Sequence, residues 1–341
     1  MPDEAMLKKE HEAQTFDPIA EWEKIEASVR EELKAAGHEN NWDEKINLEH
    51  KHFDVLEEKF VGRGVDSYHE IFSRLRAVHR ADWALERIQR INSGFHEGFE
   101  IGEMMDKRTL VEFIATCDYY HDGLTSRRNY GEINNRWVST DPVECLSVGS
   151  ALTALATKEG FHVGSNLVDL GGGNGVWAIL SKIGFNVTLI ERDKKLVEQY
   201  WIERKRLEKM GIKSGNVRTI QGEFHPEPSE NTTEIKNALE SADVMVCYPW
   251  PSETEDRLEL FRAHGKQDSL LVLYGGPMDD LRLDVDWLAK YGLEVIGEEI
   301  NRRLKERDED PDFRGYYGIR GFETPSFGAN WIVLRKKPTE K

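Results

Sequence analysis

A carboxylate and four glycines lie between a short apolar run and an apolar helical pattern near the middle of the chain. In NLVDLGGGNGVWAIL, residues 166–180, Asp169 stands two residues before Gly171, and Gly173 and Gly175 follow at every second position. Glycine at a strand-to-helix turn lets the backbone approach a ligand closely, and free N–H groups at the helix start can donate hydrogen bonds to it. An added carboxylate would repel a pyrophosphate there but would attract an ammonium group. The turn therefore favours a ligand that carries an ammonium group.

Two further acids end the next two β-rich runs. Glu191 ends VTLIE about twenty residues after the turn, where a carboxylate can accept hydrogen bonds from both hydroxyls of a ribose. Glu223 follows VRTIQG and can accept a hydrogen bond from an exocyclic amine, with Phe224 beside the base. A ligand with an amino-acid end, a ribose and an adenine satisfies all three carboxylates.

On these residues, the stretch from 165 to 337 resembles the class I S-adenosylmethionine-dependent methyltransferase fold. Asp169 to Gly175 matches the first motif of that family without a gap, Glu191 matches its ribose-binding acid, and Glu223 matches its adenine-contacting acid. The resemblance implies S-adenosylmethionine as the cofactor. The residues expected to bind it are Asp169, Gly171, Gly173, Asn174, Gly175, Glu191, Arg192, Glu223, Phe224 and Tyr248.

Two other interpretations of the glycine turn stay open. One is a structural turn flanked by surface acids. The other is a nicotinamide-binding domain, which would prefer the spacing G-x-G-x-x-G, whereas this chain has Val176 at the last position.

The end of the fourth β-rich run, VMVCYPWPSE, falls where the resembled family places the reactive sulfonium. Tyr248 and Trp250 are expected to contact the sulfonium with their ring faces through cation–π interactions. The alternative is that both side chains pack under the edge of the sheet. Tyr130 is the third candidate catalytic residue, since it could orient a substrate amine or hydroxyl. Families that act on exocyclic base nitrogens carry Asn- or Asp-Pro-Pro-aromatic here, and its absence argues against base methylation. The histidines are scattered, so no general base is assigned.

These candidates are positioned by elements whose pattern changes near residue 160. Before that point, apolar residues three and four apart predict helices within 17–37, 67–94 and 106–120. After it, seven short β-rich runs alternate with helical patterns: NLVDL, FNVTLIE, NVRTIQG, ADVMVCYP, DSLLVLYG, LEVIGEEI and NWIVLRKK. This order predicts an α/β fold, a doubly wound seven-stranded mostly parallel sheet preceded by an all-helical N-terminal domain. The loop-like stretch between the last two runs predicts that they pair as an antiparallel hairpin.

Three parts of the chain are expected. Residues 1–120 form a helical N-terminal domain, 121–147 a lid-like connecting segment, and 148–341 the S-adenosylmethionine-binding, Rossmann-like domain. Loops that hold both arginines and aromatics favour a lid over a ligand, with a polar linker as the alternative. The N-terminal helices either cap the site and supply the substrate pocket, or serve packing or dimerisation into a homodimer.

The net charge and the cysteine content indicate which classes of ligand and partner and which cellular location to expect. The 341 residues carry 46 Lys and Arg against 63 Asp and Glu, a formal net charge of -17. Such a field repels a polyanion, so a small-molecule substrate is expected rather than nucleic acid. Three distant cysteines and no Cys/His ligand cluster predict neither a disulfide framework nor a metal site, and favour a cytoplasmic location. No signal-peptide core and no run of about 18 apolar residues occurs, so no membrane span is expected.

The leading hypothesis is methyl transfer to a small molecule in a biosynthetic reaction. Because this is an in-line displacement, the enzyme mainly aligns the nucleophile and excludes water. The alternative within the same fold is attack on the aminocarboxypropyl carbon, by an external amine or by the cofactor's own amine in a cyclisation (lyase) reaction, which releases methylthioadenosine. A non-catalytic binding or scaffold protein is the third hypothesis, and the intact set of three carboxylates argues against it.

Overall fold

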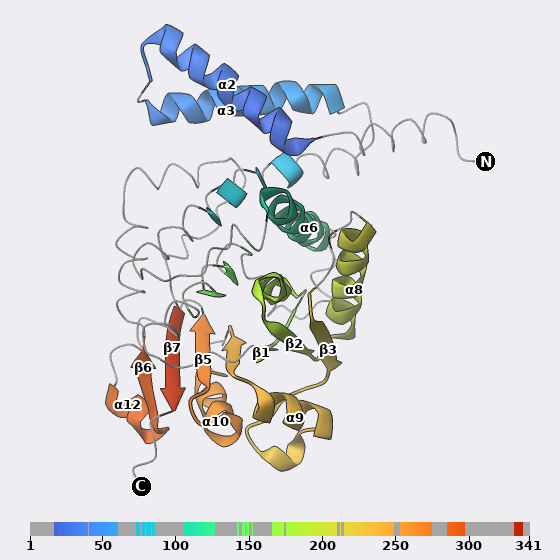
Figure 1. Cartoon of the computed structure of the whole chain (residues 1–341), viewed down its shortest axis with the longest axis vertical. Coiled ribbons are helices and arrows are strands. Elements are labelled where there is room, and N and C mark those ends of the chain that lie inside the picture. The colour runs from blue at the N-terminus through green and yellow to red at the C-terminus, as the bar shows by residue number, and fades with distance from the viewer. Residues whose placement is uncertain are drawn as a thin grey trace, which may run out of the picture. The chain divides into compact units, whose positions relative to one another are not determined.

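The computed structural model describes the helices and strands of two compact units of the chain. The described residues are 17–39, 41–60, 106–126, 166–173, 175–209, 215–248, 253–274, 285–296 and 331–336, with short pieces within 73–85 and 142–152 and residue 212. One unit contains helices α2, α3 and α6, and the other contains the β-sheet with its connecting helices (Figure 1).

The helical unit contains α2 (Pro18–Ala36), α3 (Trp42–Phe60) and α6 (Lys107–Ser126). The carboxylate of Asp17 accepts hydrogen bonds from the first backbone N–H groups of α2, and Gly37 ends the helix with a φ of 70°, a conformation that glycine adopts without strain. The buried side chains of α2 recur three and four residues apart, as predicted: Trp22, Ile25, Val29 and Leu33. The described residues within 73–85 are helical as well, so the expected helical N-terminal region is confirmed.

Helix α3 was not among the helices that the sequence predicted. Its apolar stripe is interrupted by Glu49, which is buried and lies 3.6 Å from the ammonium group of Lys45. Burial raises the pKa of Glu49 above its usual range, because water no longer stabilises the charged form. Because a charged residue occupies this buried position, the apolar residues of α3 do not recur regularly every three or four positions, and the sequence pattern did not predict the helix.

The sheet has seven strands in the order β3-β2-β1-β4-β5-β7-β6. β7 is antiparallel to both of its neighbours, and the other pairs are parallel. The strands are β1 (Asn166–Leu170), β2 (Asn186–Glu191), β3 (Val217–Gln221), β4 (Val244–Cys247), β5 (Leu270–Tyr274), β6 (Leu293–Ile296) and β7 (Trp331–Lys336). All seven predicted strands, the antiparallel β6–β7 pair and the class I methyltransferase-like fold class are therefore confirmed.

Helices connect these strands. They are η3 (Val176–Ile183), α8 (Lys194–Lys209), the short η4 (Pro228–Glu230), α9 (Thr233–Ser241), α10 (Thr254–His264) and α12 (Val285–Lys290). The segment after the glycine turn, where the sequence shows an apolar helical pattern, is a 3-10 helix. Buried residues of α9, α10 and α12 form one apolar core with alternate strand residues such as Val168, Leu170 and Ile190. Because successive strand residues point to opposite faces, Asp169 and Glu191 point away from this core.

A chain of asparagine side chains links the amino ends of three neighbouring strands. The amide of Asn216 donates to Asn186 at 2.7 Å, and Asn186 donates to Asn166 at 3.2 Å. The backbone N–H of Asn166 donates to the carboxylate of Asp243, just before β4, at 3.0 Å. These bonds fix the strand ends opposite to the edge where the glycine turn lies.

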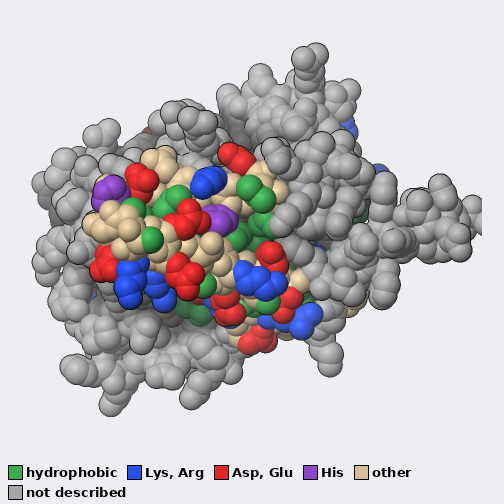
Figure 2. Space-filling model, turned by 90° about the horizontal axis from the view of Figure 1, so that it is seen from above, with side chains coloured by type: hydrophobic (Ala, Val, Ile, Leu, Met, Phe, Trp, Pro, Cys, Tyr) green, Lys and Arg blue, Asp and Glu red, His purple; other side chains and the backbone are tan. Residues whose placement is uncertain are grey.

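Charged side chains of both signs are interspersed on the described part of the face in Figure 2. On the helical unit, Lys24 forms an ion pair with Glu21 at 2.9 Å, and Nε2 of His52 lies within hydrogen-bond distance of Oε1 of Glu32, also at 2.9 Å. None of the described helices is long and apolar enough to cross a membrane.

Candidate functional site

The glycine turn after β1 is tied to the neighbouring strand. The N–H groups of Gly171 and Gly172 both donate to the carbonyl of Ile190 at 3.0 Å. Gly171, Gly173 and Gly175 have φ values of 90°, 53° and 80°, all in the left-handed region that favours glycine. The turn conformation thus explains three of the four glycines.

Packing separates the glycines by role. A Cβ on Gly172 would lie 2.8 Å from the Cβ of Leu189, and one on Gly175 would lie 2.3 Å from the ring of Tyr200. A Cβ on Gly171 would meet no heavy atom within 4 Å in the described part of the chain. Gly172 and Gly175 therefore serve close packing on β2 and α8, while space remains beside Gly171.

Asp169 is the most unusual group of the turn. Its side chain is only 3% exposed, and Oδ2 has no hydrogen-bond partner among the described residues. Burial, with a contribution from the nearby negative charge of Glu191, raises the pKa of Asp169 well above its usual range. Buried polar groups in folded proteins are almost always hydrogen-bonded, so an unpartnered buried carboxylate calls for a bound partner.

Glu191 ends β2 and holds the turn from the side. Its Oε2 accepts a hydrogen bond from the N–H of Gly173 at 2.9 Å, and its Oε1 accepts one from the N–H of Asp193 at 2.8 Å. Each carboxylate oxygen has a second lone pair, so Glu191 can still accept from two hydroxyl groups. The sequence pointed to Glu191 as a ligand-binding acid but gave no sign that it also fixes the turn.

Glu223 and Phe224 lie just beyond the end of β3. Glu223 is 56% exposed, and its Oε1 lies 3.5 Å from Nη1 of Arg192, the residue that follows β2. Phe224 is partly buried against the apolar core, with the guanidinium carbon of Arg257 4.7 Å from its ring centroid. The ends of β2 and β3 therefore bring Arg192, Glu223 and Phe224 together.

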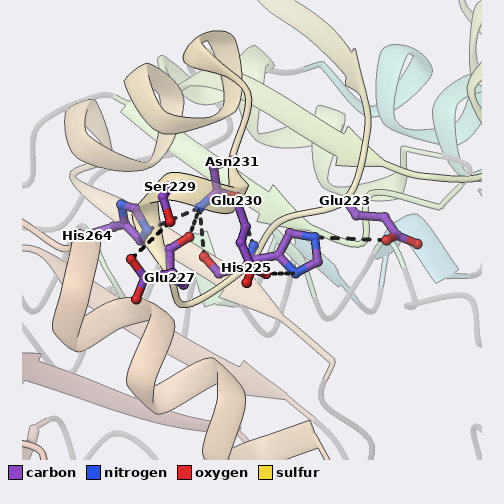
Figure 3. A network of polar contacts seen from close by, with 7 residues as sticks. All are labelled: Glu223, His225, Glu227, Ser229, Glu230, Asn231 and His264. Carbon is purple, nitrogen blue, oxygen red and sulfur yellow. Dashed lines mark hydrogen bonds and ion pairs between the residues drawn. The ribbon is translucent and has the colours of Figure 1, made fainter.

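Asn231 fixes the conformation of the loop after β3, which carries Glu223 and Phe224 (Figure 3). Its Oδ1 accepts from the N–H of His225 at 2.8 Å, and its Nδ2 donates to the carbonyl of the same residue at 2.7 Å. The same Nδ2 lies 3.3 Å from Nε2 of His264 in the last turn of α10. The His225 ring lies between two carboxylates, 3.4 Å from Glu230 and 4.0 Å from Glu223. Asn231 therefore links the end of the loop from 222 to 231 both to His225 within the loop and to His264 of α10.

The end of β4 lies beside the end of β1, where Cys247 pairs with Leu170 just before the glycine turn. Cys247 is buried, and burial raises the pKa of its thiol to about 12, so it carries no thiolate at neutral pH. Tyr248 follows it and is partly buried. Asn174, Trp250 and Tyr130 lie outside the described residues, so their predicted roles stay predictions.

Metal chemistry finds no support in the described ranges. They contain no group of three or more His, Cys, Asp or Glu side chains that could hold a metal ion. The expectation of no metal site stays a prediction.

Three residues of this region escaped the sequence analysis. Tyr200 covers Gly175 from α8, Asn231 holds the loop after β3, and Arg257 stacks on Phe224. The spacing of Glu253 and Arg257, four residues apart, is visible in the sequence as a helical ion pair. The contact of Tyr200 with Gly175 joins residues 25 positions apart, that of Arg257 with Phe224 residues 33 apart, and that of Asn231 with His225 residues 6 apart. The sequence carries no signal for these three contacts.

Solved structures similar to this chain include S-adenosylmethionine-dependent methyltransferases. One from Thiobacillus denitrificans, in complex with S-adenosyl-L-homocysteine, is 16% identical with a TM-score of 0.36, and the match covers 61% of this chain and 97% of that chain. One from Geobacter sulfurreducens, in the same kind of complex, is 14% identical with a TM-score of 0.36, again over 61% and 97%. An RNA methyltransferase from Salinibacter ruber is 20% identical with a TM-score of 0.29, over 40% of this chain and 76% of that chain.

No family model and no curated protein sequence matches this chain. At these identities and TM-scores the structural likeness assigns no activity, so the function has to be inferred from the chain's own residues.

Proposed function

We propose that this protein is an S-adenosylmethionine-dependent transferase that moves a methyl group to a small-molecule acceptor. The observation that carries the proposal is the buried carboxylate of Asp169 beside the glycine turn, whose Oδ2 has no hydrogen-bond partner among the described residues. An ammonium group placed there would supply the missing partner and compensate the buried charge.

The other described residues fit the rest of the cofactor. Glu191, at the end of β2, has lone pairs for the two ribose hydroxyls, and Gly171 has space beside it. Glu223 and Phe224, at the end of β3, suit the exocyclic amine and the face of adenine. A nicotinamide dinucleotide fits less well, because its pyrophosphate would meet two adjacent carboxylates, Asp169 and Glu191.

When bound, the cofactor would supply an electrophilic methyl group on a sulfonium. The chain would bind and orient it, align the acceptor and exclude water. We propose that Tyr248 and Trp250 contact the sulfonium and that Tyr130 orients the acceptor. None of them is proposed as a general base.

The acceptor is proposed to be a small molecule. The formal net charge of -17, with both signs interspersed on the described part of the face in Figure 2, does not suit a nucleic-acid partner.

We further propose that the helical N-terminal part supplies the acceptor pocket or a homodimer contact, and that residues 121–147 act as a lid. Of that segment, 121–126 belong to helix α6. Cys247 is buried and forms no disulfide among the described residues, which supports the proposed cytoplasmic location.

Product analysis by mass spectrometry tests the proposed reaction. The protein is incubated with S-adenosylmethionine, alone and with a pool of small amines, phenols and acids. We expect S-adenosylhomocysteine only when the pool is present, together with an acceptor whose mass has increased by one methylene. Methylthioadenosine in place of S-adenosylhomocysteine would instead establish aminocarboxypropyl transfer or, without the pool, cyclisation. If neither S-adenosylhomocysteine nor methylthioadenosine forms, the result contradicts the proposed reaction.

A further inference from the structure

Arg257 lies near the start of α10, and its guanidinium group is held in place from two sides. Its Nη2 donates to Oε2 of Glu253, one helical turn earlier, at 3.0 Å. Its guanidinium carbon lies 4.7 Å from the ring centroid of Phe224. The Arg257 side chain is 16% exposed and that of Glu253 is 28% exposed, so the pair is largely removed from solvent. A cation–π contact at a desolvated site is stronger than one on an open surface.

The stacked ring belongs to the loop that carries the proposed adenine-binding residues. Phe224 directly follows Glu223, which lies 3.5 Å from Arg192 at the end of β2. The ring packs against the apolar core and stays partly exposed. A ring with a cation over one face and core atoms at its side has little freedom to change rotamer, and its orientation is therefore set before a ligand binds.

We propose that Arg257 is a positioning residue of the adenine subsite, which fixes the ring of Phe224 as the surface against which the adenine base lies. This inference rests on the proposed function, since it names a residue that acts on the same cofactor through Phe224. The planar guanidinium group suits the role, because it can stack on an aromatic face while its edge donates to Glu253. Lysine keeps the charge but lacks the flat surface.

The test compares the dissociation constants of S-adenosylhomocysteine and methylthioadenosine, measured by calorimetry for the full-length protein and its variants. Arg257→Met should weaken both ligands by about three- to thirty-fold, the range expected for one cation–π contact. Both ligands should be affected alike, because they share the adenine and differ at the amino-acid end. Arg257→Lys should fall between the wild type and Arg257→Met.

A double-mutant cycle distinguishes positioning from general support. In a Phe224→Leu background, Arg257→Met should cause little further loss, because the ring on which Arg257 acts is gone. The matched control is Arg262→Met on the same helix. Arg262 pairs with Glu259 at 2.6 Å and is 55% exposed, and its replacement should leave both dissociation constants unchanged.

Two results would overturn the inference. One is unchanged affinity in Arg257→Met, and the other is the same loss in the presence and absence of Phe224. If Arg257→Met fails to fold, Arg257→Lys decides, since wild-type affinity in that variant would also refute the need for the planar group. Failure of the wild type to bind either ligand would refute the proposed function itself, and with it this inference.

Discussion

Among single residues, Asp169 distinguishes a binding site from a structural turn. A turn that only changes the chain direction has no use for a buried carboxylate whose Oδ2 lacks a partner in the described structure. Removing such a group usually stabilises a protein, whereas removing a ligand contact weakens binding. The two effects of replacing Asp169 should therefore have opposite signs.

Asp169→Asn is predicted to raise the free energy of unfolding of the ligand-free protein by about 1–3 kcal/mol near neutral pH. The native pKa of Asp169 is raised, so the native state binds more protons than the unfolded state, and wild-type stability falls as the pH rises above about 4 towards the native pKa. The gain in the variant should therefore grow with pH and vanish near pH 4. Denaturant unfolding at several pH values checks this, and a variant less stable than the wild type at pH 8 would refute it.

The residue types of the site were open to prediction, but their surroundings were not. Asp169, Glu191 and Glu223 stand at spacings that indicate one ligand, because parallel strands bring their carboxyl ends to one edge. That Glu191 holds Gly173 and Asp193, while Asp169 has an unpartnered oxygen, depends on positions of backbone groups that only the folded chain defines.

At the level of elements, the seven strands were predictable and two helical segments were less so. The strands are short β-rich runs bounded by turn residues, and each lies within one residue or a few of its predicted bounds. Helix α3 escaped prediction because Glu49 occupies a buried position in its apolar stripe. The sequence also gave no reason for η3 to be a 3-10 helix; it follows the tight turn at Gly175 and ends at Gly184.

The asparagine chain at the amino ends of the strands should contribute to stability and not to binding. Asn186→Ala removes a donor to Asn166 and an acceptor for Asn216, so we expect a loss of about 1–2 kcal/mol in the free energy of unfolding. The dissociation constant of S-adenosylhomocysteine should stay unchanged. Asn237→Ala, at an exposed position of α9, is the control and should cause no such loss. Weakened binding in Asn186→Ala at full stability would contradict this division of roles.

His264 should make the stability of α10 and of the loop from 222 to 231 depend on pH. Burial lowers the pKa of His264, an effect reinforced by Lys236 and opposed by Glu240 and by hydrogen bonds to the backbone at His225 and Pro226. The unfolded state then binds more protons, so the native state is fully stabilised above about pH 6.5 and loses stability as the pH falls towards the native pKa.

His264→Gln is predicted to reduce the difference in unfolding free energy between pH 7.5 and pH 5.5, because the titrating group is gone. Chemical unfolding at the two pH values measures this difference. His38→Gln, at an exposed position after α2, serves as the control and should leave the difference unchanged. An equal pH dependence in His264→Gln and in the wild type would show that other groups cause it.

For the whole molecule, the net charge of -17 predicts weak interaction with polyanions. Mixed with a structured RNA at 0.15 M salt, the protein should cause no shift in electrophoretic mobility at micromolar concentration. Tight binding that weakens steeply with added salt would reveal a basic surface and would turn the proposed acceptor class from a small molecule to a nucleic acid.

The most direct measurement for the central claim is a calorimetric titration of the full-length protein and of Glu191→Ala with S-adenosylhomocysteine. We expect one site per chain in the wild type and a binding free energy that is weaker by about 1–3 kcal/mol in the variant, since the hydroxyls of the ribose lose their acceptor. Absence of binding in the wild type, or the same affinity in Glu191→Ala, would contradict the assignment of the glycine turn and its acids as the cofactor site.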